Sequence, residues 1–204
     1  MRVLIADDHP VVLEGLAAMI GYTPDMVVVG QAGNGSQAVE MFRTLSPDVG
    51  LFDLRMPELD GVEAIQKIRR ETPDARIVVL TTFDGDEDIY RALSAGAKGY
   101  LLKDEPREVL LGVIRDVCNG KTRIPADVAG KLAERVSTTA LSEREVQVLR
   151  LIAEGQSNQE IANNLNVAES TIKTHVNSIL SKLHASDRTQ AVTIGLKRGI
   201  IHLD

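Results

Sequence analysis

Apolar and polar residues follow two different patterns along the chain. In the first 120 residues, short apolar runs alternate with segments whose apolar residues recur at helical spacing. Short runs that are bounded by turn residues are typical of strands buried on both faces. Five strand-then-helix units predict an α/β fold with a parallel, doubly wound sheet. The expected strands lie at residues 3–6, 26–30, 49–53, 76–82 and 100–103, and the expected helices begin near residues 10, 36, 61, 86 and 106.

Beyond residue 120 the strand pattern stops. One more helix is expected over residues 125–136, followed by a polar joint at residues 137–140 and then by short helices only. Residues 142–145 (SERE) have the form of a capping box, and Ser36 and Ser170 are candidate N-caps. From the residues alone, four short helices with tight turns indicate either an all-α adaptor or a helix-turn-helix unit.

Length and composition narrow the class of protein. A chain of 204 residues fits one large domain or two small ones, and 44% hydrophobic with 25% charged residues is ordinary for a soluble globular protein. There is no apolar run of about 18 residues, which a membrane span requires. Asp7 and Asp8 make the N-terminus acidic too early for a secretory signal, and the single Cys118 cannot form an internal disulfide. We therefore expect a cytoplasmic protein with no membrane partner.

Charge is unevenly distributed between the two parts of the chain. Residues 1–120 carry 12 Lys and Arg against 20 Asp and Glu, whereas residues 121–204 carry 11 against 9. An acidic N-terminal part and a mildly basic C-terminal part indicate two units with different partners. The net positive charge of the C-terminal part is too small to indicate DNA binding by itself.

Polar side chains that can react or bind a ligand lie where the strands are expected to end. They are Asp7, Asp8, Asp53, Thr81 and Lys103. Right-handed crossovers place the carboxyl ends of parallel strands at one edge of the sheet, so these side chains are expected to meet. Three neighbouring carboxylates repel one another, and a divalent cation offsets that repulsion. Several carboxylate oxygens with no His or Cys suit Mg²⁺. A carboxylate beside Mg²⁺ can accept a phosphoryl group as an aspartyl phosphate.

Four segments resemble the receiver domain of two-component response regulators: residues 5–9 (IADDH), 52–61 (FDLRMPELDG), 80–82 (LTT) and 99–104 (GYLLKD). The resemblance covers residues 1 to about 120 and implies a receiver domain at residues 1–120 with a flavodoxin-like strand order. It also implies that Mg²⁺ is the cofactor and that a sensor histidine kinase is the partner.

The resemblance assigns a role to each residue of the acidic site. Asp53 would be the phosphoacceptor. Asp8, Asp53 and the backbone carbonyl of Arg55 would hold Mg²⁺, with Asp7 acting through water. By the same resemblance, Thr81 and Lys103 would bind the phosphoryl oxygens. Tyr100 would swing inward when Thr81 moves. The sequence departs from the family pattern at Asp104, where many receivers have proline after the lysine.

Two other classes of protein remain as alternatives. Phosphatases of the haloacid dehalogenase type also use an aspartate nucleophile at a strand end, but they place a second aspartate two residues later. This chain has Arg55 there, and an arginine cannot shuttle the proton. The second alternative is a phosphorylated adaptor whose helices bind protein. We expect phosphotransfer and slow autodephosphorylation, but not a turnover enzyme.

The C-terminal helices resemble the LuxR-type helix-turn-helix from about residue 139 to 204. The matching segments are residues 141–145 (LSERE), 161–162 (IA), 167–176 (VAESTIKTHV) and 180–183 (LSKL). A receiver followed by this domain is the layout of the NarL/FixJ response regulators. It implies a linker with a helix at residues 121–139 and a DNA-binding domain at residues 140–204.

The helix expected over residues 170–183 carries the candidate DNA contacts. Small polar residues and one lysine on a helix face allow the helix to lie close in the major groove. Opposite the apolar stripe, this helix has Ser170, Lys173, Thr174, Asn177, Ser178 and Ser181. From the residues alone, a solvated face on a protein-binding bundle remains an alternative. The resemblance makes residues 189–197 the expected dimer surface. It also makes Lys173, Thr174 and Asn177 candidates for base edges, and Thr171, Lys182 and Arg188 candidates for phosphates.

The pairing of the acidic site with a helix-turn-helix predicts a transcription regulator that is switched by phosphorylation. A sensor histidine kinase would donate the phosphoryl group to Asp53, and the added charge would reposition Thr81 and Tyr100. The chain would then bind a repeated site on double-stranded DNA as a homodimer.

Overall fold

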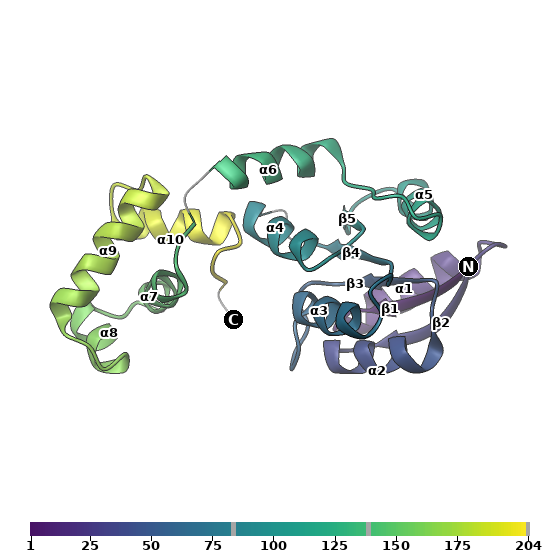
Figure 1. Ribbon diagram of the computed structural model, residues 1–204, viewed down its shortest axis with the longest axis horizontal. Helices are drawn as coiled ribbons and strands as arrows, with labels where there is room; N and C mark the ends of the chain where they lie inside the picture. Colours follow the sequence, from purple (N-terminus) through teal and green to yellow (C-terminus); the bar gives the residue numbers. More distant parts are fainter. Residues whose placement is uncertain (83–84, 138–139, 203–204) are drawn as a thin grey trace. The chain divides into compact units, whose positions relative to one another are not determined.

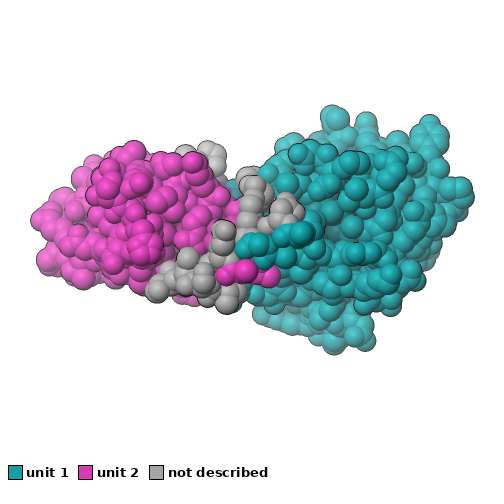
Figure 2. Space-filling view, turned by 90° about the horizontal axis from the view of Figure 1, so that it is seen from above, with its two compact units in different colours: residues 1–84, 89–130 teal, residues 85–88, 131–204 magenta. Residues whose placement is uncertain are grey.

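The computed structural model describes residues 1–82, 85–137 and 140–202. The polar joint expected at residues 137–140 lies partly outside the described residues, at 138–139. Asp84, which we expect to lead with Gly85 and Asp86 into the fourth helix, also lies outside them. The chain divides into two compact units (Figure 2), one formed by residues 1–84 and 89–130 and the other by residues 85–88 and 131–204.

The first unit is built on a parallel sheet of five strands in the order β2-β1-β3-β4-β5. Figure 1 shows these strands running through the middle of the unit, with helices on both sides. The predicted fold class and the flavodoxin-like order are confirmed. The strands are β1 (Arg2–Ala6), β2 (Val27–Ala32), β3 (Val49–Phe52), β4 (Ile77–Thr81) and β5 (Gly99–Leu102).

The helices of this unit cover both faces of the sheet. They are α1 (Pro10–Gly21), α2 (Gly35–Leu45), α3 (Gly61–Glu71), α4 (Asp86–Ser94) from residue 89 onward, and α5 (Arg107–Cys118). Ile5 of β1 packs with Ile20 of α1 and Ile114 of α5 in one core cluster. Because neighbouring side chains of a strand point to opposite faces, Phe52 at the end of β3 faces the other layer. There its ring meets Phe42 of α2, with 6.4 Å between centroids.

The second unit contains only helices among its described residues. The first unit ends within α6 (Ala126–Ser137), at residue 130. The helices that follow α6 are α7 (Glu143–Ala153), α8 (Asn158–Asn164), α9 (Glu169–Leu183) and α10 (Arg188–Lys197). Leu149 of α7, Ile161 of α8, Ile172 of α9 and Ala191 of α10 share one buried core. The helical pattern predicted after residue 141 is therefore confirmed. No helix in the described ranges has the length and apolar character needed to cross a membrane.

Helix starts follow local side-chain chemistry, with two corrections to the sequence-based predictions. The predicted capping box is present, because Ser142 and Glu145 each bond the other's backbone N–H. The cap of α2 is Asn34, whose side chain accepts from the Gln37 N–H at 2.8 Å, so Ser36 lies inside the helix. Ser170 lies inside α9, which starts after Ala168 without a side-chain cap.

Candidate functional site

The carboxyl ends of β1, β3 and β5 place three charged residues at one edge of the sheet. Ladder hydrogen bonds continue one residue past each strand. The Asp7 N–H donates to the Ala32 carbonyl at 3.0 Å, the Asp53 N–H to the Ala6 carbonyl at 2.9 Å, and the Lys103 N–H to the Thr81 carbonyl at 2.9 Å. Because the backbone is fixed at these positions, the directions of the side chains follow from the sheet itself.

Lys103 joins the two buried carboxylates of this edge. Its Nζ lies 2.6 Å from Asp7 Oδ2 and 2.8 Å from Asp53 Oδ2. The exposed fractions are 14% for the Lys103 side chain, 2% for Asp7 and 4% for Asp53. The sequence-based prediction that these residues meet is confirmed by these distances. Because all three groups are buried, the charge of the Lys103 ammonium strongly affects the charges of the Asp7 and Asp53 carboxylates, and the reverse also holds.

The pKa of Lys103 reflects this arrangement. Burial by itself would lower it, but the hydrogen bonds and charges of Asp53 and Asp7 outweigh burial and raise the pKa above the ordinary lysine value of 10.5. Since the folded-state pKa is raised, the stabilisation is present in full below pH 10.5 and is lost as the pH rises through the folded-state pKa. Lys103 is therefore charged at neutral pH, which the predicted role in binding phosphoryl oxygens requires.

The site also contains a histidine that the sequence analysis left out. His9 Nδ1 lies 2.8 Å from Asp8 Oδ1 and 3.2 Å from Asp7 Oδ1. Asp7, Asp8, His9 and Asp53 each offer a ligand atom, all within 4.8 Å of one another. The expectation of a cluster with no His was therefore wrong. The carboxylate oxygens still suit Mg²⁺, which prefers oxygen ligands. Only the adjacency of His9 to the Asp7-Asp8 pair was visible in the sequence.

The loop after β3 is shaped by a close backbone approach. The Gly61 N–H donates to the Leu54 carbonyl at 2.8 Å. A Cβ at Gly61 would lie 2.1 Å from the Asp53 carbonyl oxygen, so this position requires glycine. The Leu54 N–H donates to Asp53 Oδ1 at 2.7 Å, while Oδ2 receives Lys103. Arg55, the expected source of a backbone carbonyl ligand, follows in this loop two residues after Asp53.

The two expected switch residues lie on neighbouring strands. Thr81 ends β4 and Tyr100 lies in β5, and both are fully buried. In the β4–β5 register, Thr81 is opposite Leu102 and Tyr100 is opposite Val79. The Lys103 N–H continues this ladder to Thr81. A shift of the Thr81 backbone would therefore also move β5, which contains Tyr100 and precedes Lys103.

In the second unit, α9 has the exposed face that the sequence predicted. Thr171, Lys173, Thr174 and Asn177 are exposed, whereas Ile172 and Ile179 are buried. Lys173 forms an ion pair with Glu169 one turn earlier, at 3.0 Å. Four of the six candidate DNA contacts thus share one solvent-facing side of a helix.

The other two candidates have partners within this unit. Lys182 Nζ lies 2.7 Å from Glu145 Oε2, and Arg188 donates to the Gln156 carbonyl at 2.7 Å. Ser178, which the sequence analysis placed on the exposed face, instead donates to Glu145 Oε1 at 2.6 Å. Glu145 thus links α7 to α9. The capping box marked it as a helix-start residue, but nothing local signalled a contact more than thirty residues away.

Glu145 is a buried acid that stays ionised. Burial alone would raise its pKa, but hydrogen bonds from Lys182, Ser178 and Ser142 outweigh burial and lower the pKa from 4.5 to about 2. The carboxylate is therefore charged throughout the physiological range. It joins the start of α7 to the C-terminal half of α9.

Comparisons with known proteins match both units. Residues 3–115 match the family described as "Response regulator receiver domain", and residues 139–194 match "Bacterial regulatory proteins, luxR family". The transcriptional regulatory protein LiaR of Bacillus subtilis (strain 168) is 41% identical over 210 residues, covering 99% of this chain and 100% of LiaR.

Solved structures of response regulators also match. The RcsB response regulator of Salmonella typhimurium aligns with a TM-score of 0.70 and 31% identity, covering 95% of this chain and 98% of that one. A structure of an RcsB–DNA complex aligns with a TM-score of 0.69 and 30% identity, covering 97% and 98%. The chain belongs to the NarL/LuxR family of two-component response regulators, in which a receiver domain is joined to a LuxR-type DNA-binding domain to regulate transcription.

Proposed function

We propose that a sensor histidine kinase donates a phosphoryl group to Asp53 and that this modification raises the affinity of the chain for its DNA site. The observation that carries the proposal is the buried contact of Lys103 with Asp53 and Asp7, at 2.8 and 2.6 Å. This geometry gives a nucleophilic carboxylate an adjacent cation. In the proposal residues 1–120 form the receiver, residues 121–139 the linker and residues 140–204 the DNA-binding domain.

The donor set of the site supports Mg²⁺ as the cofactor. Asp8, Asp53 and the Arg55 carbonyl would hold the ion, with Asp7 acting through water. When bound, Mg²⁺ offsets the negative charge of the carboxylates and of the phosphoryl oxygens. The acidic cluster and the absence of cysteine from it fit a hard, oxygen-binding cation.

Asp53 and the residues around it each have a separate role in the proposed phosphoryl transfer. One Asp53 carboxylate oxygen attacks phosphorus in line with the leaving group, which is the phosphohistidine imidazole of the kinase. The P–O bond to Asp53 forms as the P–N bond breaks, and the charge that develops lies on the three phosphoryl oxygens. Lys103 Nζ and the Thr81 hydroxyl donate to those oxygens. Thr81 is drawn toward the phosphoryl group, and Tyr100 then swings into the space it leaves. The chain accepts and slowly loses one phosphoryl group, so it is not a turnover enzyme.

In the second unit, α9 is proposed to enter the major groove. Lys173, Thr174 and Asn177 read base edges, and Thr171, Lys182 and Arg188 hold phosphates. The outer face of α10 pairs two phosphorylated chains, which spaces the recognition helices about one DNA turn, or roughly 10 bp, apart.

A DNA-binding assay tests the proposed switch. We expect incubation with Mg²⁺ and acetyl phosphate to raise the affinity of the wild-type chain for its DNA site about tenfold, which corresponds to about 1.4 kcal/mol of coupling. Asp53→Asn removes the acceptor and should show no such rise. A mobility shift assay with both proteins measures the effect. An equal rise in the variant would contradict the proposal.

The roles of two DNA contacts are separated by sequence and salt dependence. Asn177→Ala is expected to lose about 1–3 kcal/mol of affinity for the specific site and little for unrelated DNA. Arg188→Gln should weaken binding to both DNAs and reduce the slope of log affinity against log salt by about 1. Fluorescence anisotropy over a salt series measures both quantities. A loss from Asn177→Ala that is the same on both DNAs would remove it from base recognition.

A further inference from the structure

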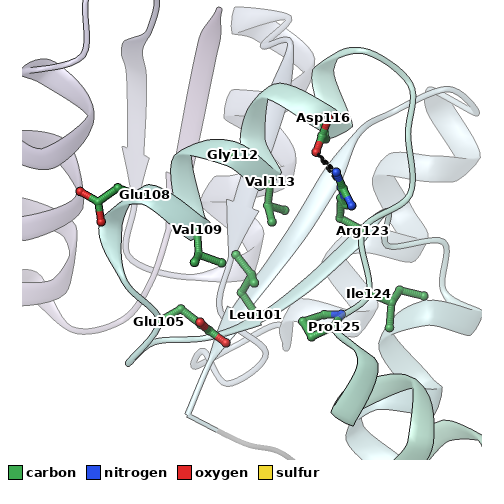
Figure 3. A pocket seen from close by; sticks show the side chains of 10 residues that line it. All are labelled: Leu101, Glu105, Glu108, Val109, Gly112, Val113, Asp116, Arg123, Ile124 and Pro125. Carbon is green, nitrogen blue, oxygen red and sulfur yellow. Dashed lines mark hydrogen bonds and ion pairs between the residues drawn. The ribbon is translucent and has the colours of Figure 1, made fainter.

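A groove lies in the first unit between α5 and the extended segment that follows it (Figure 3). Its volume is about 340 Å³, within the range of about 300–1,000 Å³ that small-molecule sites occupy. The apolar part of the lining comes from Leu101, Val109, Gly112, Val113, Ile124 and Pro125. None of these residues belongs to the acidic site or to the DNA-binding face.

One wall of the groove is held in place by the edge of the sheet. The Arg123 N–H donates to the Lys98 carbonyl at 2.8 Å, and the Tyr100 N–H donates to the Arg123 carbonyl at 3.2 Å. The Arg123 side chain is also bonded to Asp116 of α5, with 2.6 Å between Nε and Oδ2. Backbone and side-chain contacts therefore fix this wall at the groove's far end.

The floor of the groove has room for an apolar group. A Cβ added at Gly112 would meet no atom within 4 Å, so the missing side chain leaves open space in the middle of α5. Val109, one turn earlier, is 41% exposed although it is a large apolar residue. Covering Val109 and filling the space over Gly112 would remove apolar surface from water, which is favourable.

The opposite end of the groove carries negative charge. Figure 3 shows Glu105 and Glu108 at the end away from the Asp116–Arg123 pair. The Glu105 carboxylate is directed across the groove toward Pro125, and the Glu108 carboxylate is directed away from the groove. In the part of the chain that the structure describes, neither carboxylate forms an ion pair or side-chain hydrogen bond, whereas Asp116 is paired with both Lys121 and Arg123. The groove thus has an apolar middle and one anionic end.

We propose that this groove binds a small amphipathic organic cation. An apolar body of about one ring lies over Gly112 between Val109 and Pro125, and a single ammonium or guanidinium group pairs with Glu105. Anionic ligands are repelled by the same carboxylate. Such a ligand bridges α5 and segment 121–125, and it stabilises the packing of that segment on β5 because it binds only the folded unit.

The probe for the test is 3-phenylpropylamine, titrated into the full chain while amide NMR shifts are recorded. We expect saturable shifts at Val109, Gly112 and Val113, with a Kd on the order of 1 mM for a ligand of this size. The matched probes 3-phenylpropanol and 3-phenylpropanoate keep the ring but change the head group. The alcohol should bind roughly tenfold more weakly, and the carboxylate should produce no saturable shifts. Equal binding of the three probes, or no saturation with the amine, would overturn the proposal.

Substitutions in and outside the groove test whether the ligand binds there. Gly112→Leu fills the open space with a residue that favours the helix, and it should abolish saturation by the amine. Gly15→Leu is the matched control on α1, because a Cβ there also meets nothing within 4 Å; it should bind the amine as wild type does. Glu105→Gln should weaken binding of the amine roughly tenfold and leave binding of the alcohol unchanged. Amine binding by Gly112→Leu that equals the control's would locate the ligand elsewhere and contradict the inference.

Discussion

Replacing Lys103 with methionine is expected to lower the free energy of unfolding of the first unit by about 3 kcal/mol at pH 7 in the presence of a chelator. The substitution keeps the apolar stem but removes the ammonium that lies 2.6 Å from Asp7 and 2.8 Å from Asp53. Two buried carboxylates then face each other without a counter-charge. Removing one partner of a buried ion pair typically costs 3–5 kcal/mol for this reason.

Saturating Mg²⁺ should restore most of the stability that Lys103→Met loses, because a divalent cation offsets the same repulsion. Amide hydrogen exchange at β3 and β4, with and without Mg²⁺, measures both effects. Lys67→Met on the exposed side of α3 is the control and should stay within about 0.5 kcal/mol of wild type. A Lys103→Met protein as stable as wild type in chelator, or one that is indifferent to Mg²⁺, would contradict this description of the site.

The second large effect is expected in the DNA-binding unit. Glu145→Gln should lower the free energy of unfolding of this unit by about 3 kcal/mol at pH 7, since a pKa lowered from 4.5 to about 2 corresponds to stabilisation of this order. The neutral amide cannot pair with Lys182 and loses the charge that strengthens the bonds from Ser178 and Ser142. Specific DNA affinity should fall roughly tenfold because α9 is no longer fixed to α7.

The direction of the Glu145 pKa shift determines how the stability difference between wild type and Glu145→Gln changes with pH. Because the folded-state pKa is lowered, the stabilisation is present above pH 4.5 and is lost as the pH falls toward 2. Wild type and Glu145→Gln should therefore differ most at neutral pH and converge in acid. Hydrogen exchange at α7 and α9 measures the difference. Glu143→Gln, an exposed change in the same helix turn, is the control; an equal loss in both variants would show that Glu145 has no special role.

The sheet and its site were largely predictable because the signals are local in the chain. Each strand is a short apolar run, and parallel strands place the residues that follow them at one edge, so Asp7, Asp53 and Lys103 were expected to meet before any distance was known. Their burial and direct pairing could not be predicted, because these depend on how tightly the loops close. The loop after β3 closes through Gly61, whose role follows from a backbone approach rather than from a pattern.

The residues that sequence reasoning placed wrongly share one cause. His9 was left out of the acidic cluster because its ring reaches back to two acids beside it in the chain, which depends on a rotamer. Ser178 was assigned to the exposed face because helical spacing gives the side of a helix and not its partners. The carboxylate that turns Ser178 inward belongs to Glu145, on a helix more than thirty residues earlier. Contacts of that range follow from tertiary packing, which periodicity alone does not encode.

The central claim is that Asp53 accepts the phosphoryl group, and mass spectrometry tests it most directly. The full chain is incubated with Mg²⁺ and acetyl phosphate, beside Asp53→Asn, and intact masses and proteolytic fragments are then recorded. The wild-type chain should gain one acid-stable, base-labile phosphoryl group on the fragment that contains Asp53, and Asp53→Asn should gain none. Equal labelling of the two proteins, or a phosphoryl group on another fragment of the wild type, would contradict the account.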